Sequence, residues 1–185
     1  MIDHFDLLAP IYDRLFGPPD PARLRALLRL PAAGWLLDAG GGTGRVSSQL
    51  RPLVDNLVIS DASEQMLRQA QAKDICPTQT QVERLPFPDD SFERVLVVDA
   101  LHHFHHQPAA IRDLIRVLKP GGRLVIEEPD INHVGVKLVA LAEKLLLMGS
   151  HFYAPAEIRD MVSAHGLPAR IETDGTFAAW IVADK

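Results

Sequence analysis

The stretch LLDAGGGTGRVS at residues 36–47 constrains this chain most, because a short apolar run leads directly into a cluster of glycines. Such a run, followed by a helix-like segment, predicts a buried strand, a tight turn and a helix. This geometry brings backbone N–H groups close to a ligand without obstruction by side chains. Glycines at 40, 42 and 44 follow a G-x-G-x-G spacing, unlike the dinucleotide fingerprint, and no P-loop Lys-Ser or Lys-Thr pair follows. A glycine-rich turn without a ligand stays open at this point.

The rest of the chain alternates strand-like and helix-like segments. Strands are expected at 35–39, 57–60, 79–82, 92–98, 123–127, 170–174 and 177–183. Helices are expected at 2–16, 21–30, 44–53, 63–72, 108–118, 134–148 and 154–165. This alternation predicts an α/β fold, a Rossmann-like doubly wound seven-stranded sheet that is mostly parallel. The last two strands are joined by too short a turn for a crossover, so one strand near the C-terminus is expected to be antiparallel.

Length, charge and cysteine content limit the class of protein. The 185 residues suffice for one domain, so we expect a single domain over 1–185 with N-terminal helices at 1–30 and a lid-like insertion at 129–153. The net charge of -5 argues against a nucleic-acid partner. The single cysteine, Cys76, excludes an intrachain disulfide and a cysteine-based zinc site. No signal peptide or membrane-spanning run is recognisable, so we expect a cytoplasmic protein without stable membrane insertion.

The insertion contains the segment VGVKLVALAEKLLLM, at residues 134–148, whose apolar arc is wider than a single core contact needs. Its only charges, Lys137, Glu143 and Lys144, are expected on one side of a helix. Three interpretations remain open: a helix packed into the core, a lid over an apolar acceptor, or a contact between two subunits.

A second acidic residue strengthens the case for a ligand at the glycine turn. Asp61, in the stretch VISDAS, ends the second expected strand. In folds of this kind that strand end lies beside the glycine loop, where a carboxylate accepts hydrogen bonds from ribose hydroxyls. An acid that only caps a helix or faces solvent is the alternative. The glycine loop and the acid together favour a nucleoside-like ligand.

At this point the chain resembles a class I S-adenosylmethionine-dependent methyltransferase, of the small-molecule group that includes the ubiquinone and menaquinone biosynthesis C-methyltransferases (methyltransferase type 11). The matching stretches are APIYD (9–13), LLDAGGGTG (36–44), SDASEQML (60–67), ERLPFPDDSFERV (83–95), ALHHF (100–104), LKPGGRLVI (118–126) and HFYAPAEI (151–158). The resemblance implies S-adenosyl-L-methionine as cofactor. It also implies methyl transfer, by in-line displacement, to a small acceptor that is apolar or quinone-like.

The resemblance also implies which residues contact the cofactor. They are Tyr12, Asp38, Gly40, Gly41, Gly42, Gly44, Asp61, Ala62, Gln81, Val82 and Asp99. In the family, the acid at the position of Asp38 and the glycines surround the methionine part, and the acid at Asp61 holds the ribose. Tyr12 is expected to close over the cofactor, or else to be a core tyrosine. Gln81 departs from the family, which usually has Asp there. Its amide oxygen can still accept a hydrogen bond from the adenine amino group; the alternative is that Gln81 points away and backbone groups of Val82 bind the base.

The stretch DALHHFHHQP, at residues 99–108, follows the fourth expected strand. Because ligands of open α/β sheets lie beyond the carboxyl ends of the strands, the acceptor is expected there. The sulfonium of the cofactor already activates the methyl group, so a general base is needed only if the acceptor must lose a proton. The candidates are Asp99, His102, His103, Glu127, Glu128, His133, His151 and Tyr153, with His103 ranked first and His102 second as catalytic residues. His105 and His106 are interpreted as solvated turn residues.

No metal is expected, because no matching carboxylate or cysteine set stands near the histidines in the sequence. A non-catalytic S-adenosylmethionine-binding module, acting as a sensor or partner subunit, is the alternative to an enzyme. The glycine spacing disfavours a nicotinamide-dependent oxidoreductase. The sequence leaves open the identity of the acceptor, whether carbon, nitrogen or oxygen is methylated, and whether the chain forms a homodimer.

Overall fold

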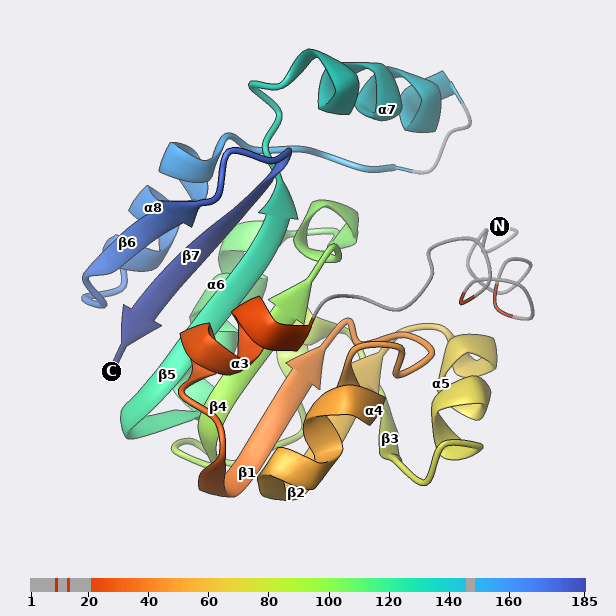
Figure 1. Cartoon of the computed structure of the whole chain (residues 1–185), viewed down its shortest axis with the longest axis vertical. Helices are drawn as coiled ribbons and strands as arrows, with labels where there is room; N and C mark the ends of the chain where they lie inside the picture. The colour runs from red at the N-terminus through yellow and green to blue at the C-terminus, as the bar shows by residue number, and fades with distance from the viewer. Residues whose placement is uncertain (1–8, 10–12, 14–20, 146–148) are drawn as a thin grey trace.

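The computed structural model describes residues 9, 13, 21–145 and 149–185, and within them seven strands form one sheet (Figure 1). The strands are β1 (Ala32–Ala39), β2 (Val54–Asp61), β3 (Cys76–Gln79), β4 (Phe92–Val98), β5 (Leu118–Pro129), β6 (Ala169–Thr173) and β7 (Ala178–Asp184). Their order across the sheet is β3-β2-β1-β4-β5-β7-β6. Strands β1 to β5 run parallel, whereas β7 is antiparallel to both neighbours. The predicted doubly wound sheet with one reversed strand is confirmed.

Helices cover both faces of the sheet, because successive strand residues point to opposite sides. Leu36 packs with α3, α4 and α5 on one face, and Leu37 packs with α6 and α8 on the other. The helices are α3 (Pro21–Leu28), α4 (Ser47–Leu50), α5 (Glu64–Gln71), α6 (Gln107–Val117), α7 (Val134–Leu145) and α8 (Pro155–Ser163). Short 3₁₀ turns occur at η1 (Arg51–Leu53), η2 (Val82–Arg84) and η3 (Leu101–His103). The chain reverses its direction of winding between β1 and β4, where such sheets bind ligands.

Several elements differ in their bounds from the sequence prediction; β5, for example, begins at Leu118 instead of residue 123. The third strand lies at Cys76–Gln79, not 79–82, because its register is set by pairing with β2 at the sheet edge, where proline is tolerated. Val82 consequently belongs to a 3₁₀ turn. The helix expected at 44–53 is helical only from Ser47, since Gly44 adopts a φ of 72° and extends the loop. The helix expected at 2–16 lies almost entirely outside the described residues.

Helix α7 stands beyond the carboxyl end of β5 (Figure 1). Val136 is its one buried residue in the described range. Its exposed apolar side chains are Val134, Leu138, Val139, Leu141 and Leu145. Of the three charged residues, Glu143 is half-buried, whereas Lys137 and Lys144 are exposed. No helix among the described residues is both long and apolar enough to span a bilayer.

Candidate cofactor and acceptor site

The loop after β1 contains glycines whose backbone conformation or close packing disfavours a larger residue. Gly40 has a φ of 73° and donates from its backbone N–H to the Ser60 carbonyl at 2.7 Å. A Cβ there would lie 2.7 Å from Cβ of Ala100, so a glycine lets β1 and β4 end side by side. Gly42 has a φ of 54°, and a Cβ there would come no closer than 3.9 Å to Asp61 and 4.0 Å to Met66. Among the residues that the structure describes, the loop backbone at Gly42 is thus not crowded on the side that faces Asp61.

The Asp61 carboxylate is held in place by the same loop. It accepts hydrogen bonds from the backbone N–H groups of Gly42 at 3.0 Å and Ser63 at 2.8 Å. A carboxylate oxygen can accept more than one hydrogen bond. The Asp61 carbonyl accepts from the Thr80 N–H at 2.9 Å, which brings the next residue, the exposed Gln81, to the same rim. Ala62 is exposed there and Val82 is buried.

Asp38 lies beneath the loop and is 1% exposed. Its carboxylate accepts a hydrogen bond from the Ser47 hydroxyl at 2.6 Å. Burial raises the pKa of Asp38 to about 6, although the Ser47 hydrogen bond and the charge of Arg45 act in the opposite direction. A Cβ on Gly41 would lie 2.8 Å from the Asp38 carboxylate, so the loop backbone covers this acid closely.

A polar clamp joins the N-terminal segment to the glycine loop. Asp13 accepts hydrogen bonds from the Thr43 hydroxyl and from Nζ of Lys73, and Lys73 also donates to the Thr43 carbonyl at 2.8 Å. Sequence reasoning missed this clamp, because its three residues lie far apart along the chain. The Tyr-Asp pair in APIYD was the only signal. Tyr12 itself lies outside the described residues.

The exit of β4 is organised by Glu128, which is 3% exposed. Its Oε1 accepts from the backbone N–H groups of Ala100 at 3.0 Å and Leu101 at 2.7 Å. Its Oε2 lies 2.7 Å from Nδ1 of the buried His102. Burial alone would lower the pKa of His102, but the hydrogen bond and charge of Glu128 raise it above the ordinary value. The His102 ring also stacks on Phe152, with 4.2 Å between ring centroids.

His103 follows in the same turn but differs in its electrostatics. Burial, and then the nearby charge of His102, lower the pKa of His103 to about 3. Its Nδ1 lies 3.1 Å from the Ser150 hydroxyl. An imidazole with so low a pKa accepts protons poorly near neutral pH, and the ranking of His103 as first choice for a base stays a prediction.

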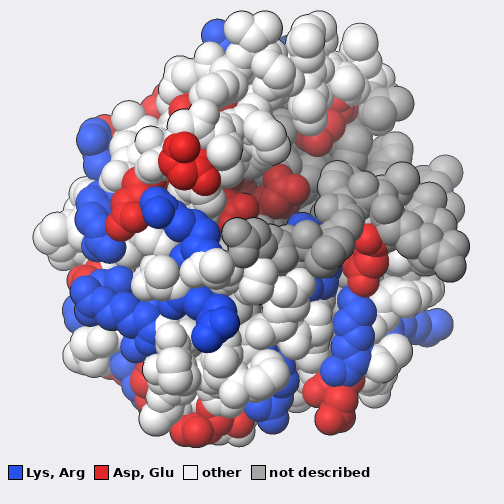
Figure 2. Space-filling model, viewed as in Figure 1, with Lys and Arg blue, Asp and Glu red and all other residues white. Residues whose placement is uncertain are grey.

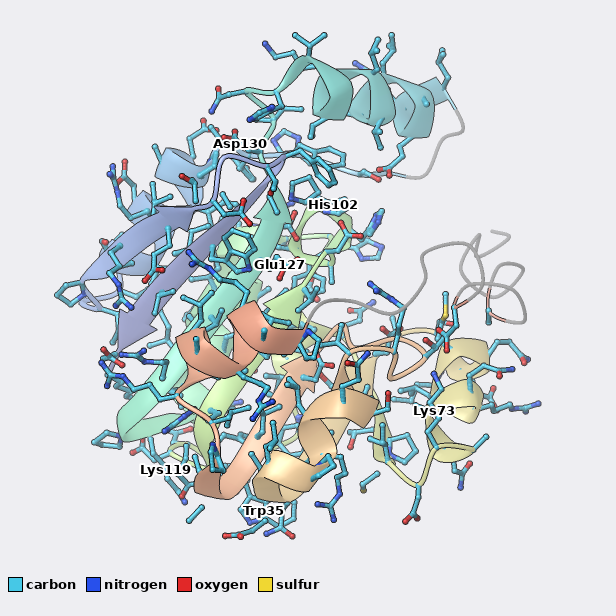
Figure 3. The ribbon with its side chains drawn as sticks, in the orientation of Figure 1. Trp35, Lys73, His102, Lys119, Glu127 and Asp130 are labelled. Carbon is cyan, nitrogen blue, oxygen red and sulfur yellow. The ribbon has the colours of Figure 1, made fainter. Side chains whose placement is uncertain are left out.

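Asp99 and Glu127 extend this row of acids along the ends of β4 and β5. Asp99 has a φ of 52°, and its N–H donates to the Glu127 carbonyl at 3.0 Å. Burial raises the pKa of Asp99 to about 6 and raises that of Glu127 above its usual range. Glu127 accepts from Nε1 of Trp180 at 2.8 Å. Figure 3 places His102 and Glu127 at the edge of the sheet that faces α7, opposite Trp35 and Lys119.

A family model described as a methyltransferase domain matches residues 37–126, from β1 into β5. These residues belong to the methyltransferase domain family. The matched segment includes the glycine loop, Asp61, Asp99 and both candidate histidines, whereas Glu127, Glu128 and α7 follow it. The family resemblance expected from the sequence is thereby confirmed.

A curated relative and two solved structures are similar to this chain, the structures in their fold. A ubiquinone/menaquinone biosynthesis C-methyltransferase, UbiE, of Pseudomonas putida is 38% identical over 50% of this chain and 41% of its own length. The chain thus matches about two fifths of the length of that curated relative. A structure from Thermotoga maritima, described as a SAM-dependent methyltransferase, has a TM-score of 0.82 and 20% identity, covering 98% of each chain. A chain in the complex of the Haloferax volcanii Trm112 methyltransferase activator also has a TM-score of 0.82 and 20% identity, covering 100% of this chain and 98% of that one.

The cofactor of the methyltransferase domain is S-adenosylmethionine, and the loop residues fit it. The fixed carboxylate of Asp61, beside the Gly42 backbone, has the chemistry to accept from ribose hydroxyls; that it binds them stays a prediction. Arg45 directly follows the last loop glycine. Its charge partly offsets the rise that burial causes in the pKa of Asp38, Asp99 and Glu127, so these acids share it as a nearby cation. Sequence reasoning did not single out Arg45. The contacts of individual residues with the cofactor stay predictions.

Three further histidines, His106, His133 and His151, differ in their contacts. The backbone N–H of His151 donates to the His102 carbonyl at 2.8 Å, and its ring lies against Tyr153 with 4.5 Å between centroids. His133 is exposed. His106 was expected to be a solvated turn residue; it is exposed, yet its Nδ1 accepts from the Ala109 N–H at 3.1 Å and caps α6. Its role is therefore to start a helix.

Proposed function

We propose that the chain transfers the methyl group of S-adenosylmethionine to a small acceptor that is apolar or quinone-like. The observation that carries this proposal is the cradle formed by the glycine loop and Asp61, with a row of buried acids and histidines at the neighbouring strand ends. We infer that nucleoside recognition and a second, differently lined position share one edge of the sheet, as a two-substrate reaction requires.

The charge of the site supports binding of a cationic cofactor. S-adenosylmethionine carries a sulfonium and an amino group, and both are attracted by carboxylates. Asp38, Asp99 and Glu127 offer such groups on three adjacent strands, with Arg45 as a nearby counter-charge. Figure 2 shows acidic side chains gathered below the α7 end of the molecule. We expect Asp61 to hold the ribose, Gln81 and Val82 to border the adenine, and Asp99 to lie near the reacting methyl group.

The acceptor is proposed to bind between the β4 exit and the segment 129–153. This insertion would then act as a lid over the acceptor. Helix α7 lies beyond the strand ends and carries exposed apolar side chains that an apolar acceptor could contact. The name of the Pseudomonas putida relative concerns quinone C-methylation, which is why a quinone-like acceptor is included in the proposal. The limited match to that relative's length makes this a proposal about class only.

The chemistry asks for alignment more than for reactive side chains. When bound, the cofactor supplies an activated methyl group, and the acceptor's lone pair or π electrons form the new bond as the bond to sulfur breaks. The residues of this chain bind the two substrates in line and exclude water. His102 and His103 are proposed to meet the acceptor, since they stand at the strand-four exit and their rings lie 4.0 Å apart.

Incubation with methyl-labelled S-adenosylmethionine and a panel of quinols, phenols and fatty acceptors tests this function. Label transferred to at least one acceptor, and lost in the Asp61→Ala variant, is the expected result. Binding of S-adenosylhomocysteine without transfer to any acceptor would favour the non-catalytic module instead. Absence of S-adenosylhomocysteine binding at high micromolar concentration would overturn both the enzyme and the module.

A further inference from the structure

Three potential metal ligands meet between η3 and α7. His102, His103 and Glu143 each bring one ligand atom to within 4.8 Å of the other two. The histidines follow β4, whereas Glu143 comes from a helix much later in the chain. Two imidazoles and one carboxylate form the donor set that proteins use for Zn²⁺ and other divalent transition metals.

In both histidines, Nδ1 lies within hydrogen-bond distance of a polar side chain. Nδ1 of His102 lies 2.7 Å from Glu128, and Nδ1 of His103 lies 3.1 Å from the Ser150 hydroxyl. Histidines that bind metals commonly use one ring nitrogen for the ion and the other for a carboxylate or similar partner, which fixes the ring orientation. By this pattern, Nε2 would be the ligand atom of His102.

Glu143 provides an independent observation that points to a ligand. Its Oε2 atom is buried and has no hydrogen-bond partner among the residues that the structure describes. A buried carboxylate oxygen is costly unless a hydrogen-bond donor or a cation compensates it. Glu143 is also the one acidic residue of α7, while Lys137 and Lys144 of that helix are exposed.

We propose that His102, His103 and Glu143 bind one divalent transition-metal ion, with Zn²⁺ as the best match, and that this ion ties α7 to the exit of β4. Three protein ligands leave a tetrahedral ion with one further position, for water or for an oxygen of a bound molecule. The inference goes beyond the proposed methyl transfer, and ion binding does not depend on that activity. It would make the two histidines ligands instead of proton acceptors.

Titration of the chelator-treated full chain with Zn²⁺, followed by calorimetry, tests the ion site. The visible absorption of bound Co²⁺ reports the ligand geometry in parallel. We expect one saturable site, weakened at least about tenfold in both the Glu143→Gln and His103→Gln variants. The exposed His105→Gln variant, in the same loop, is the matched control and should bind as the unchanged chain does. Because Glu143 is only half-buried, its variant is expected to fold.

Hydrogen exchange tests the proposed tie between α7 and the sheet. Zn²⁺ should slow amide exchange in α7 of the unchanged chain and leave it unaltered in Glu143→Gln. The inference is overturned if no saturable binding occurs below about 1 mM Zn²⁺. A Kd of about 1 mM corresponds to only about 4 kcal/mol of binding free energy. An equal loss in His105→Gln, or full binding by Glu143→Gln, would also overturn it. S-adenosylhomocysteine binding, measured separately with chelator, shows whether the proposed methyl transfer stands or fails independently.

Discussion

Nδ1 of His102 lies 2.7 Å from Oε2 of Glu128, and the two side chains are only 3% and 4% exposed. The other Glu128 oxygen accepts two backbone N–H groups from the β4 exit. One carboxylate thus fixes both the turn that carries the candidate histidines and the orientation of the first of them. The arrangement makes Glu128 a positioning residue for this part of the site.

Replacement of Glu128 by alanine should cost about 3–5 kcal/mol of unfolding free energy, because it leaves three buried donors or charges without a partner. Glu128→Gln keeps one acceptor oxygen and should cost less than the alanine variant. Urea denaturation followed by circular dichroism measures both. Glu64→Gln, which alters an exposed pair with Arg68, serves as control and should change the free energy by less than about 0.5 kcal/mol. Equal stability of the unchanged chain and Glu128→Ala would contradict the account of this turn.

The two loop glycines should respond differently to alanine. Gly40→Ala places a Cβ against Ala100 and should destabilise the fold by about 2 kcal/mol or more, through overpacking and a left-handed backbone. Gly42→Ala meets no close neighbour among the described residues and should cost about 1 kcal/mol, for the backbone alone, yet weaken cofactor binding at the loop. Thermal unfolding and calorimetry with S-adenosylhomocysteine separate the two effects. The reverse pattern would show that the cofactor does not approach the loop at Gly42.

The buried Asp38 should make stability depend on pH. Its pKa rises from 3.8 in the unfolded chain to about 6 in the fold, so the folded state binds more protons between these values. The contribution of Asp38 to the unfolding free energy therefore falls as pH rises from about 4 to 7, by up to about 3 kcal/mol. Asp38→Asn removes this titration. The difference in unfolding free energy, variant minus unchanged chain, should therefore become more positive from about pH 4 to about pH 7, whether it is negative or positive at the lower pH. A difference that stays constant with pH in urea denaturation would show that the pKa of Asp38 is not raised.

The clamp of Asp13, Thr43 and Lys73 should affect binding more than stability. If the N-terminal segment closes over the cofactor, Lys73→Gln loosens its attachment and should weaken S-adenosylhomocysteine binding by about 3- to 10-fold, the equivalent of one or two hydrogen bonds. The melting temperature should change by only a few degrees, because the pair is partly exposed. Lys137→Gln, an exposed residue of α7, is the control. Unchanged affinity in Lys73→Gln would disconnect the N-terminal segment from the cofactor.

The sheet and the cofactor side of the site follow closely from local patterns. Apolar runs that end in glycine or acid mark β1 and β2, and their carboxyl ends must meet in a parallel sheet, so Asp61 could be placed beside the glycine loop from the sequence. β3 could not be placed as well, since four weakly patterned residues at an edge depend on pairing with β2.

Features that depend on how distant segments pack were not visible in the sequence. Helical spacing put Glu143 with two lysines but could not show which side of α7 faces the sheet. The low pKa of His103 results from burial, which depends on the segment around Ser150 and Phe152 covering η3. The expectation that no metal takes part came from a sequence without an evident matching set of ligands, because Glu143 lies about 40 residues after the histidines and only the fold brings it near them.

The central claim, a cofactor held by the glycine loop and Asp61, is tested most directly by calorimetry with S-adenosylhomocysteine. The unchanged chain should bind one equivalent, and Asp61→Ala should bind at least about tenfold more weakly, because charge-assisted hydrogen bonds to the ribose are lost. Asp55→Asn, which alters an exposed carboxylate that accepts from Gly34, should bind as the unchanged chain does. Equal affinity of Asp61→Ala and the unchanged chain, or no binding by either, would contradict the claim.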